Sequence, residues 1–379
     1  MTPKLVFLKG MNRKNSKLNI TAVDLFCGAG GLTRGLLDSG IKVKIGVDFD
    51  GQFKDTYEKN NHPSRFLQCD IRKLKTKYLE ECLKLEETDL FLLSACAPCQ
   101  PFSRQNSKHH YDRRKSLLLE VVRILDELKR KPDFLFFENV PHINRSERST
   151  VLRRLRKALV KMGYSFDSKI VDAAIYGVPQ RRKRFILIAV KKKIAGNTVR
   201  FPEELFGKDR NQPYRTVREA IGAFPRIRAG QTHAQVANHQ TQSLTTKTRM
   251  RLLLTPKNGG SRRDWPDRVK LKCHEEHVGH WDVYGRMKWN EPSPTLTCRC
   301  TSISNGRFGH PTQLRAISLR EAAALQTFPN DYQFYGSFKA IAMQVGNAVP
   351  VLLAEAFGKH FIEIGNGKSF ATRTEKNTE

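Results

Sequence analysis

Residues 92–103 read LLSACAPCQPFS, an apolar stretch that stops at small residues and continues into a turn with two prolines around a cysteine. The apolar residues 90–93 predict a buried strand. Because proline fixes φ, Pro98 and Pro101 hold Cys99 in a stiff turn at the end of that strand. Reacting groups commonly lie at strand ends in open α/β sheets. Cys99 is therefore a candidate nucleophile.

The charge of the chain points to a polyanionic partner. Its 379 residues include 67 Lys and Arg against 37 Asp and Glu, a formal net charge of +30. An excess of this size is typical of nucleic-acid binding and argues against an enzyme of small neutral metabolites. A basic surface kept for solubility is the alternative. The length is sufficient for two domains with a substantial core.

No apolar run approaches the length of a transmembrane helix, so we expect no membrane contact. The apolar residues 5–8 are too few for a signal-peptide core. We therefore expect a cytoplasmic protein. The eight cysteines lack the spacing of a small secreted scaffold, and we expect them to be free thiols.

The N-terminal third predicts an adenosine-binding unit. Residues 20–26 read as a strand, and the turn CGAGG at 27–31 leads into a helix that stops at Gly40. This layout lets backbone N–H groups approach a nucleotide-like ligand. A second strand, 43–47, ends at Asp48 and Phe49. Asp48 stands about 20 positions beyond the glycines, where its carboxylate can hydrogen-bond to the two hydroxyls of a ribose. The Phe49 ring can lie against the face of an adenine.

A third strand, residues 65–69, again ends at an acid, Asp70. Three successive strands with turn residues at their tips predict a doubly wound parallel sheet, so the fold class is α/β and Rossmann-like. The third glycine of a dinucleotide fingerprint and a Walker lysine loop are both absent from the sequence, so a bound phosphate is not indicated.

An acid follows the next predicted strand as well. Residues 116–130 predict a helix, and residues 133–137 predict a buried strand that runs into Glu138. A carboxyl group at the end of an apolar strand loses solvation, which raises its pKa and suits proton donation near neutral pH. Alternatively, Glu138 is an acid that caps a helix or lies in a loop and has no catalytic role. The polar, basic residues 104–115 predict a lid beside Cys99.

Residues 180–184 read QRRKR and run directly into an apolar strand, 185–190. In an extended chain Gln180, Arg182 and Arg184 share one face, while the two residues between them point the other way. One face can thus reach a buried site. A solvated charge run is the alternative, although such runs seldom adjoin a core strand.

The composition changes near Lys191. Residues 195–315 are rich in Gly, Pro, Thr, Arg and His, which predicts a separate, loop-rich and mostly β domain. Within it, residues 259–265 (GGSRRDW) predict a basic loop whose tryptophan is suited to contact with a nucleic-acid groove or phosphate.

Several cysteines and histidines of this region invite a zinc interpretation: Cys273, His274, His277, His280, Cys298 and Cys300. They include no Cys-x-x-Cys pair, so no metal site is predicted. Cys96 and Cys99 have that spacing, but the following Gln-Pro and the lack of a second pair argue against a redox motif. Cys96 is interpreted as strand-end filler.

These pieces together resemble the bacterial DNA (cytosine-5) methyltransferases. The resemblance covers residues 20–190 and 285–358, and its motifs stand in the family's order and spacing. They are DLFCGAGG at 24–31, the acid at 48, DI at 70–71, PCQ at 98–100, ENV at 138–140, QxRxR at 180–184, RE at 320–321, LQTFP at 325–329 and QxGN at 344–347.

The resemblance implies a Rossmann-like catalytic domain into which a smaller, mostly β and loop target-recognition domain is inserted. We expect a basic arm at 1–18, the catalytic domain at 19–194, the recognition domain at 195–335, a segment returning to the catalytic domain at 336–365, and a polar tail at 366–379.

The implied cofactor is S-adenosyl-L-methionine. The residues expected around it are Phe26, Gly28, Ala29, Gly30, Gly31, Asp48, Phe49, Asp70, Ile71, Pro98, Leu117, Asn347, Ala348 and Val349.

The implied chemistry explains the residue types at the catalytic positions. Carbon 5 of cytosine becomes nucleophilic when a thiolate, from Cys99, adds to carbon 6. Glu138 would hydrogen-bond or protonate ring nitrogen 3, Arg182 would hold the ring carbonyl oxygen, and Arg184 would help orient the site. Nearby positive charge would lower the thiol pKa. The base that removes the carbon 5 proton is not identified.

The expected partner is double-stranded DNA, from which the target cytosine must be flipped out. Phosphate contacts of the basic excess would offset that cost and make binding depend steeply on salt. A cognate restriction endonuclease that acts separately is a further expected partner, unless the enzyme is an orphan methylase. We expect a monomer near the nucleoid of a bacterium or encoded by a phage.

Two rival readings are weaker. An RNA cytosine-5 methyltransferase is the nearest, but the Cys-Phe-Thr tripeptide of the tRNA-modifying branch is absent from the sequence. A non-catalytic DNA-binding relative is the other, and the intact Cys99, Glu138 and Arg182 argue against it.

Overall fold

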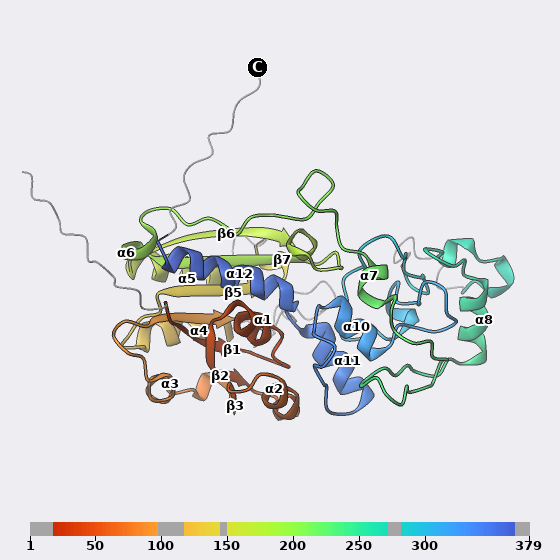
Figure 1. Ribbon diagram of the computed structural model, residues 1–379, viewed down its shortest axis with the longest axis horizontal. Helices are drawn as coiled ribbons and strands as arrows, with labels where there is room; N and C mark the ends of the chain where they lie inside the picture. The colour runs from red at the N-terminus through yellow and green to blue at the C-terminus, as the bar shows by residue number, and fades with distance from the viewer. Residues whose placement is uncertain (1–17, 98–116, 145–149, 272–281, 368–379) are drawn as a thin grey trace, which may run out of the picture.

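The computed structural model describes residues 18–97, 117–144, 150–271 and 282–367. The molecule is elongated (Figure 1). One end holds a seven-stranded sheet covered by helices, and the other end, which we call the recognition part, is built from short helices and loops of residues 216–337. Residues 199–206 lie along the sheet instead, where Phe201 packs against Phe357. Cys99, Pro98, residues 104–115, the N-terminal arm and most of the tail lie outside the described residues.

The sheet has the strand order β3-β2-β1-β4-β5-β7-β6. Neighbouring strands from β3 through β5 are parallel, which confirms the Rossmann-like α/β prediction. The strands are β1 Ile20–Leu25, β2 Lys42–Asp48, β3 Arg65–Gln68, β4 Leu90–Ala95, β5 Phe134–Asn139, β6 Tyr164–Asp172 and β7 Lys183–Lys191.

The predicted parallel arrangement does not extend to β7, which runs antiparallel to both β5 and β6. The connection from Asp172 to Lys183 holds only a short 3-10 turn, Ala173–Tyr176. A parallel crossover needs a dozen or more residues, so the chain must turn back.

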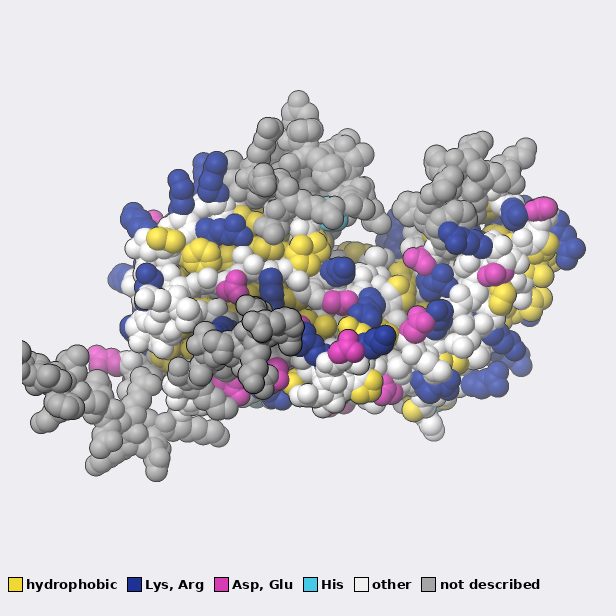
Figure 2. Space-filling model, turned by 90° about the horizontal axis from the view of Figure 1, so that it is seen from above, with side chains coloured by type: hydrophobic (Ala, Val, Ile, Leu, Met, Phe, Trp, Pro, Cys, Tyr) yellow, Lys and Arg dark blue, Asp and Glu magenta, His cyan; other side chains and the backbone are white. Residues whose placement is uncertain are grey.

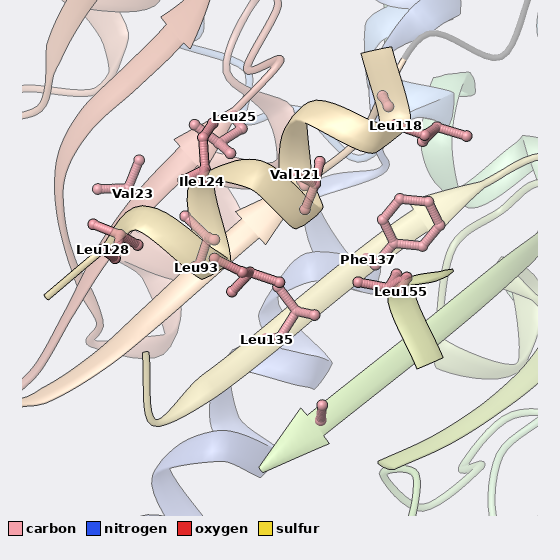
Figure 3. Packing of buried hydrophobic residues seen from close by; sticks show 14 of the residues in the cluster. Val23, Leu25, Leu93, Leu118, Val121, Ile124, Leu128, Leu135, Phe137 and Leu155 are labelled. Carbon is pink, nitrogen blue, oxygen red and sulfur yellow. The ribbon is translucent and has the colours of Figure 1, made fainter. Parts of the chain in front are cut away.

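Helices cover both faces of the sheet, and alternate strand residues face each layer. Figure 3 shows Leu93, Leu135 and Phe137 pointing toward α4 (Leu117–Glu127) and α5 (Thr150–Lys161). Their neighbours in the strands face α1 (Gly31–Ser39) and α12 (Val351–Gly365). Because both of their faces are covered, the central strands β1, β4 and β5 are buried at every residue instead of at alternate ones. The remaining sheet helices are α2 Lys54–Asn60, α3 Thr76–Leu83 and α6 Lys192–Ala195.

The C-terminal helix returns to the sheet and packs against α1. A Cβ at Gly35 would lie 2.3 Å from the carbonyl oxygen of Val351, and one at Gly358 would lie 2.2 Å from Ser39 Oγ. Glycine on each helix therefore allows their close approach.

One expectation about membranes needs correction. Residues Phe338–Gly365, which comprise α11 (Phe338–Asn347) and α12, are long and apolar enough to pass as a membrane span by length and composition. However, 67% of their most apolar window is buried inside the protein. This is the pattern of core helices.

The recognition part is loop-rich as predicted, but the prediction of mostly β structure is wrong. Its described residues form isolated β-bridges and no longer strand. The helices of its described residues are α7 Val217–Ile221, α8 Thr246–Leu254 and α10 Leu319–Leu325. The buried guanidinium of Arg286 donates to the carbonyls of Leu252, Thr255, His310 and Gln313. A side chain thus satisfies loop carbonyls that strand pairing would otherwise satisfy.

The tryptophan of residues 259–265 is not available for a nucleic-acid groove. Trp265 is 3% exposed, packs edge-on against Tyr284 and donates from Nε1 to Thr255 Oγ1 at 2.8 Å. It is a core residue of the recognition part, which corrects the expectation.

A buried polar network lies beneath the glycine turn. Asp24 of β1 accepts hydrogen bonds from Thr33 Oγ1 at 2.7 Å and Ser94 Oγ at 3.1 Å. Thr33 also lies 3.0 Å from the Tyr57 hydroxyl. Burial raises the pKa of the Asp24 carboxyl from 3.8 to about 7.

This pKa predicts a pH-dependent term in stability. Between pH 3.8 and about 7 the folded protein keeps a proton on Asp24 that the unfolded chain has lost. The stability that comes from holding this proton is fully present below that window and is lost as the pH rises, by at most about 1.4 kcal/mol per pH unit. The substitution Asp24→Asn, which cannot ionise, should therefore gain stability relative to wild type from pH 4 to 7. The free energies of unfolding in urea across this range test it, and a difference between the two proteins that stays constant with pH would contradict it.

Candidate active site

The site lies where β1, β2, β4 and β5 end together at one edge of the sheet. From β1 the chain passes to β2 on one side, whereas from β4 it passes to β5 on the other. Ligands bind at such a switch point in open α/β sheets. Asn139, the last residue of β5, donates from Nδ2 to the carbonyl oxygen of Ala97 at 3.2 Å. This bond fixes the chain two residues before Cys99.

Glu138 is buried beside an arginine. Its side chain is 10% exposed, and its Oε1 lies 2.9 Å from Nε of Arg184, whose side chain is 12% exposed. Burial raises the pKa of the Glu138 carboxyl, and the positive charges of Arg184 and Arg182 oppose the rise. The expected desolvation and raised pKa are both confirmed. A carboxyl group held in this way keeps its proton to a higher pH than an exposed glutamate does.

Cys96 lies at the same edge but is unsuited to be a nucleophile. Burial and the neighbouring carboxylate of Glu138 raise the pKa of its thiol well above the usual value. A thiolate is the reactive form of cysteine. The side chain packs among the core residues under α12, as expected of filler.

Residues 180–184 alternate as the sequence predicts. Gln180 and Arg182 are buried, whereas Arg181 and Lys183 are exposed. Arg184 follows on the buried face and reaches Glu138.

The guanidinium of Arg182 is surrounded by main-chain carbonyl groups. Its Nη1 donates to Leu296 at 2.9 Å, and its Nη2 donates to Gly346 at 3.1 Å and to Ala348 at 3.0 Å. These carbonyls belong to the recognition part and to the end of α11. Arg182 thus joins both segments to β7. The ion pair with Glu138 that the described residues show is formed by Arg184.

Two glutamines complete this junction. Gln180 Nε2 donates to Gln326 Oε1 at 2.9 Å, and Gln180 Oε1 accepts from the Leu296 amide at 3.0 Å. Gln326 Nε2 donates to the carbonyl of Val345 at 2.7 Å. Both glutamines stand in the motifs quoted from the sequence, but only the structure reveals that they bond to each other.

The glycine turn divides into an open and a packed portion. Gly28 has a φ of +52°, and a Cβ there would meet no atom within 4 Å. At Gly30 a Cβ would lie 2.3 Å from Asn61 Nδ2, and at Gly31 one would lie 2.4 Å from the Val349 carbonyl oxygen. Ala29 is also buried. Gly28 therefore faces open space, whereas the other three residues pack against the protein.

The acid and the aromatic at the end of β2 are both placed for a ligand. Asp48 accepts from the amides of Gly28 at 2.9 Å and Asp50 at 3.0 Å, one on each carboxylate oxygen. Burial raises the pKa of this carboxyl. The Phe49 side chain is 73% exposed, the most exposed large apolar side chain among the described residues. Nothing in the described fold covers this ring.

The other expected cofactor residues differ in exposure. Asp70 is partly exposed and bonds to Arg72, which lowers the pKa of its carboxyl. Phe26 and Leu117 are partly exposed, whereas Ile71 is buried in the core.

At the end of α11, Asn347 is exposed, Ala348 is partly exposed and Val349 is buried. The Cys298 thiol donates to Asn347 Oδ1 at 2.9 Å. A residue of the recognition part thus touches a residue expected at the cofactor. The sequence did not point to this contact, because the two positions are 49 residues apart.

The structure groups no three potential metal ligands among its described residues. Cys300 is buried, and burial raises the pKa of its thiol to about 12, which disfavours the thiolate that zinc requires. Residues 273–280 lie outside the described ranges.

Known proteins share this chain's motifs and fold. The family model for C-5 cytosine-specific DNA methylases matches residues 20–363. The Type II methylase M.HgiDII of Herpetosiphon aurantiacus is 38% identical over 89% of this chain and 93% of its own length. The Type II methyltransferase M1.HphI of Haemophilus parahaemolyticus is 30% identical over 93% of this chain and 89% of its own length.

Among solved structures, a putative DNA modification methyltransferase encoded within an Escherichia coli prophage superposes with a TM-score of 0.70. It is 23% identical and covers 92% of this chain and all of its own, so it supports the fold. The family match spans nearly the whole described chain and includes both the sheet edge and the recognition part. The chain belongs to the C-5 cytosine-specific DNA methylases.

Proposed function

We propose that Cys99 is the nucleophile with which this DNA cytosine-5 methyltransferase activates its target base, and that Glu138 and Arg184 hold that base. The observation that carries the proposal is the buried pair of Glu138 and Arg184, 2.9 Å apart. Glu138 lies on β5, the strand next to β4, which leads to Cys99. The substrate is DNA, and the cofactor S-adenosyl-L-methionine supplies an electrophilic methyl group on a positively charged sulfur.

In the proposed reaction the thiolate of Cys99 adds to carbon 6 of a flipped-out cytosine. Glu138, whose pKa burial raises, donates a hydrogen bond or a proton to ring nitrogen 3. Electron density then moves toward carbon 5, which would accept the methyl group supplied by the cofactor. Loss of the carbon 5 proton to a base and elimination of the Cys99 thiolate from carbon 6 would then restore the aromatic ring. Arg184 orients the Glu138 carboxyl and is the better placed arginine to hold the ring carbonyl oxygen, because it already borders that carboxyl.

Arg182 is proposed as a positioning residue, since its Nη atoms already donate to three carbonyl groups. This proposal differs from the role that the sequence motif implied for it, which was a direct contact with the base. Holding Leu296 and Ala348 would align the recognition part with the cofactor end of α11.

The residues that would hold the cofactor fit its chemistry. The uncovered ring of Phe49 suits an adenine face. The Asp48 carboxylate can accept hydrogen bonds from ribose hydroxyls in addition to those from the amides of Gly28 and Asp50, and the open side of Gly28 leaves room for the chain of the ligand. Ala29, Gly30, Gly31, Ile71 and Val349 would shape the pocket from behind.

The relatives favour a role in restriction and modification, since M.HgiDII and M1.HphI are both Type II enzymes by name. We infer a cognate endonuclease that acts separately, a monomeric methyltransferase, and a location on the bacterial or phage DNA of the cytoplasm. The recognition part would select the target sequence.

The substitution Cys99→Ala should abolish methyl transfer and leave the binding of DNA and cofactor intact, because only the nucleophile is removed. Transfer of labelled methyl groups to DNA measures the first effect, and equilibrium binding measures the second. Cys96→Ala is the matched control and should retain activity. A rate near wild type in the Cys99 variant would refute the proposal.

The substitution Glu138→Gln should lower the single-turnover rate at least about tenfold. In wild type the rate should fall as the pH rises through the raised pKa of Glu138, because the proton is then lost. Arg184→Met removes a positive charge that lowers the pKa of Glu138. The Glu138 pKa should therefore be higher in this variant, and its remaining activity should persist to a higher pH than in wild type. A pH profile that is identical in wild type and the Arg184 variant would exclude the proposed pairing.

The substitution Arg182→Lys should raise the KM for S-adenosylmethionine at least about tenfold, because a single ammonium cannot reach all three carbonyls. The effect on kcat should be smaller. Arg181→Lys, at the exposed neighbouring position, is the control and should change neither constant. An unchanged cofactor KM, with a folded variant by circular dichroism, would exclude the positioning role.

A further inference from the structure

A second group of cations lies at the edge of the sheet opposite to the active site. We call it the distal basic edge and define it as Arg130, Lys131, Lys161, Lys191, Lys192 and Lys193. These residues follow α4, end α5 and β7, and begin α6. In Figure 2, dark blue Lys and Arg side chains stand at the end of the molecule remote from the recognition part, where Figure 1 places α6.

One buried acid holds this edge together. The Asp133 carboxylate, 3% exposed, lies 3.4 Å from Lys191 Nζ and 3.6 Å from Lys193 Nζ. Lys191 Nζ also donates to the carbonyl oxygen of Lys131 at 2.7 Å. The Lys192 amide donates to the carbonyl of Gly163, two residues beyond Lys161, at 3.0 Å. The six cations therefore form one continuous group.

The charge of this group is not balanced by the described protein. One carboxylate serves both Lys191 and Lys193, and Arg130 donates to the carbonyl groups of Glu86 and Asp89 and not to their carboxylates. The Lys193 side chain remains 69% exposed. Burial lowers the pKa of Lys191; Asp133 opposes this shift, and the nearby Lys193 and Arg130 add to it. Such crowding of like charges favours an anionic ligand.

Helix α5 extends the group along the surface. Its sequence contains five Lys and Arg residues and no acid. Arg153, Lys157 and Lys161 are exposed and four residues apart, so they form one stripe along about 12 Å of helix. None of the three forms an ion pair with a described residue. A row of free cations of this length matches a polyanion better than a single small anion.

From these contacts we propose that the distal basic edge and the stripe on α5 bind a second segment of duplex DNA through its phosphates, without regard to sequence. Duplex DNA is the favoured occupant because it is the polyanion on which this enzyme acts. The edge is formed where β4 and β5 begin, whereas the active site is formed where they end. Bending one stiff duplex around the sheet to reach both would cost several kcal/mol, so a separate segment is the simpler occupant.

A second contact of this kind would keep the enzyme on DNA between targets. While the recognition part leaves one segment, the distal basic edge would remain bound to another, and the effective concentration of DNA near the active site would stay high.

The test uses a labelled duplex of about 14 A·T base pairs, which contains no cytosine and so cannot enter the active site by base flipping. Titration and sedimentation at low salt should give two duplexes per wild-type chain. The triple variant Lys161→Gln, Lys192→Gln, Lys193→Gln should bind one. The control Lys75→Gln, Lys77→Gln, Lys84→Gln alters three exposed lysines of α3 and its ends and should bind two.

The salt dependence of the second binding step should have a slope of about −3 or steeper, as expected from three or more phosphate contacts. One duplex per wild-type chain, or two per chain in the Lys161 triple variant, would overturn the proposal. A single-stranded RNA of equal length that displaces the duplex from the edge at a lower concentration than the duplex itself would also overturn it.

Methylation of a short target-containing duplex separates this proposal from the catalytic one. The Lys161 triple variant should keep its kcat/KM for such a substrate within about twofold of wild type, because the altered residues lie at the opposite edge of the sheet from the active site. Loss of methylation in this variant would mean that the edge serves the active site itself, which would refute a separate DNA contact.

Discussion

The buried guanidinium of Arg182 is the contact on which the arrangement of the active edge depends. It lies on the chain entering β7, yet its hydrogen bonds end on Leu296 and on Gly346 and Ala348, more than 100 residues later. A charge at 2% exposure is stable only because each of these groups accepts from it. One side chain thus aligns the sheet, the recognition part and the end of α11, and that alignment decides where DNA and cofactor can meet.

Charge is used differently on the two sides of the sheet. At the active edge, carboxyl groups are buried next to few cations, so the pKa values of Asp48 and Glu138 are raised. At the opposite edge, Asp133 is buried among several cations. The carboxyl groups of the active edge can therefore hold protons more readily, whereas the opposite edge favours the binding of phosphates. Burial and the nearby Glu138 carboxylate also keep the thiol of Cys96 protonated, which distinguishes it from the proposed nucleophile Cys99.

The strands, the sheet helices and the acids at the strand ends could be predicted from the sequence because each depends on local periodicity. The alternation from Gln180 to Arg184 predicted correctly which side chains are buried. It could not predict their partners, because the carbonyls that meet Arg182 come from distant segments. The antiparallel β7 and the core position of Trp265 were missed for the same reason, since both depend on contacts between residues that are not adjacent along a helix or strand.

Covalent trapping tests the central claim most directly. A duplex library of random sequence, in which 5-fluorocytosine replaces cytosine, would be incubated with the enzyme and S-adenosylmethionine. Fluorine cannot leave carbon 5 as a proton does, so the bond between sulfur and carbon 6 should persist after methyl transfer. The account predicts a stable protein–DNA adduct whose peptide is linked through Cys99. Attachment through any other residue, or an active enzyme that forms no adduct, would contradict it.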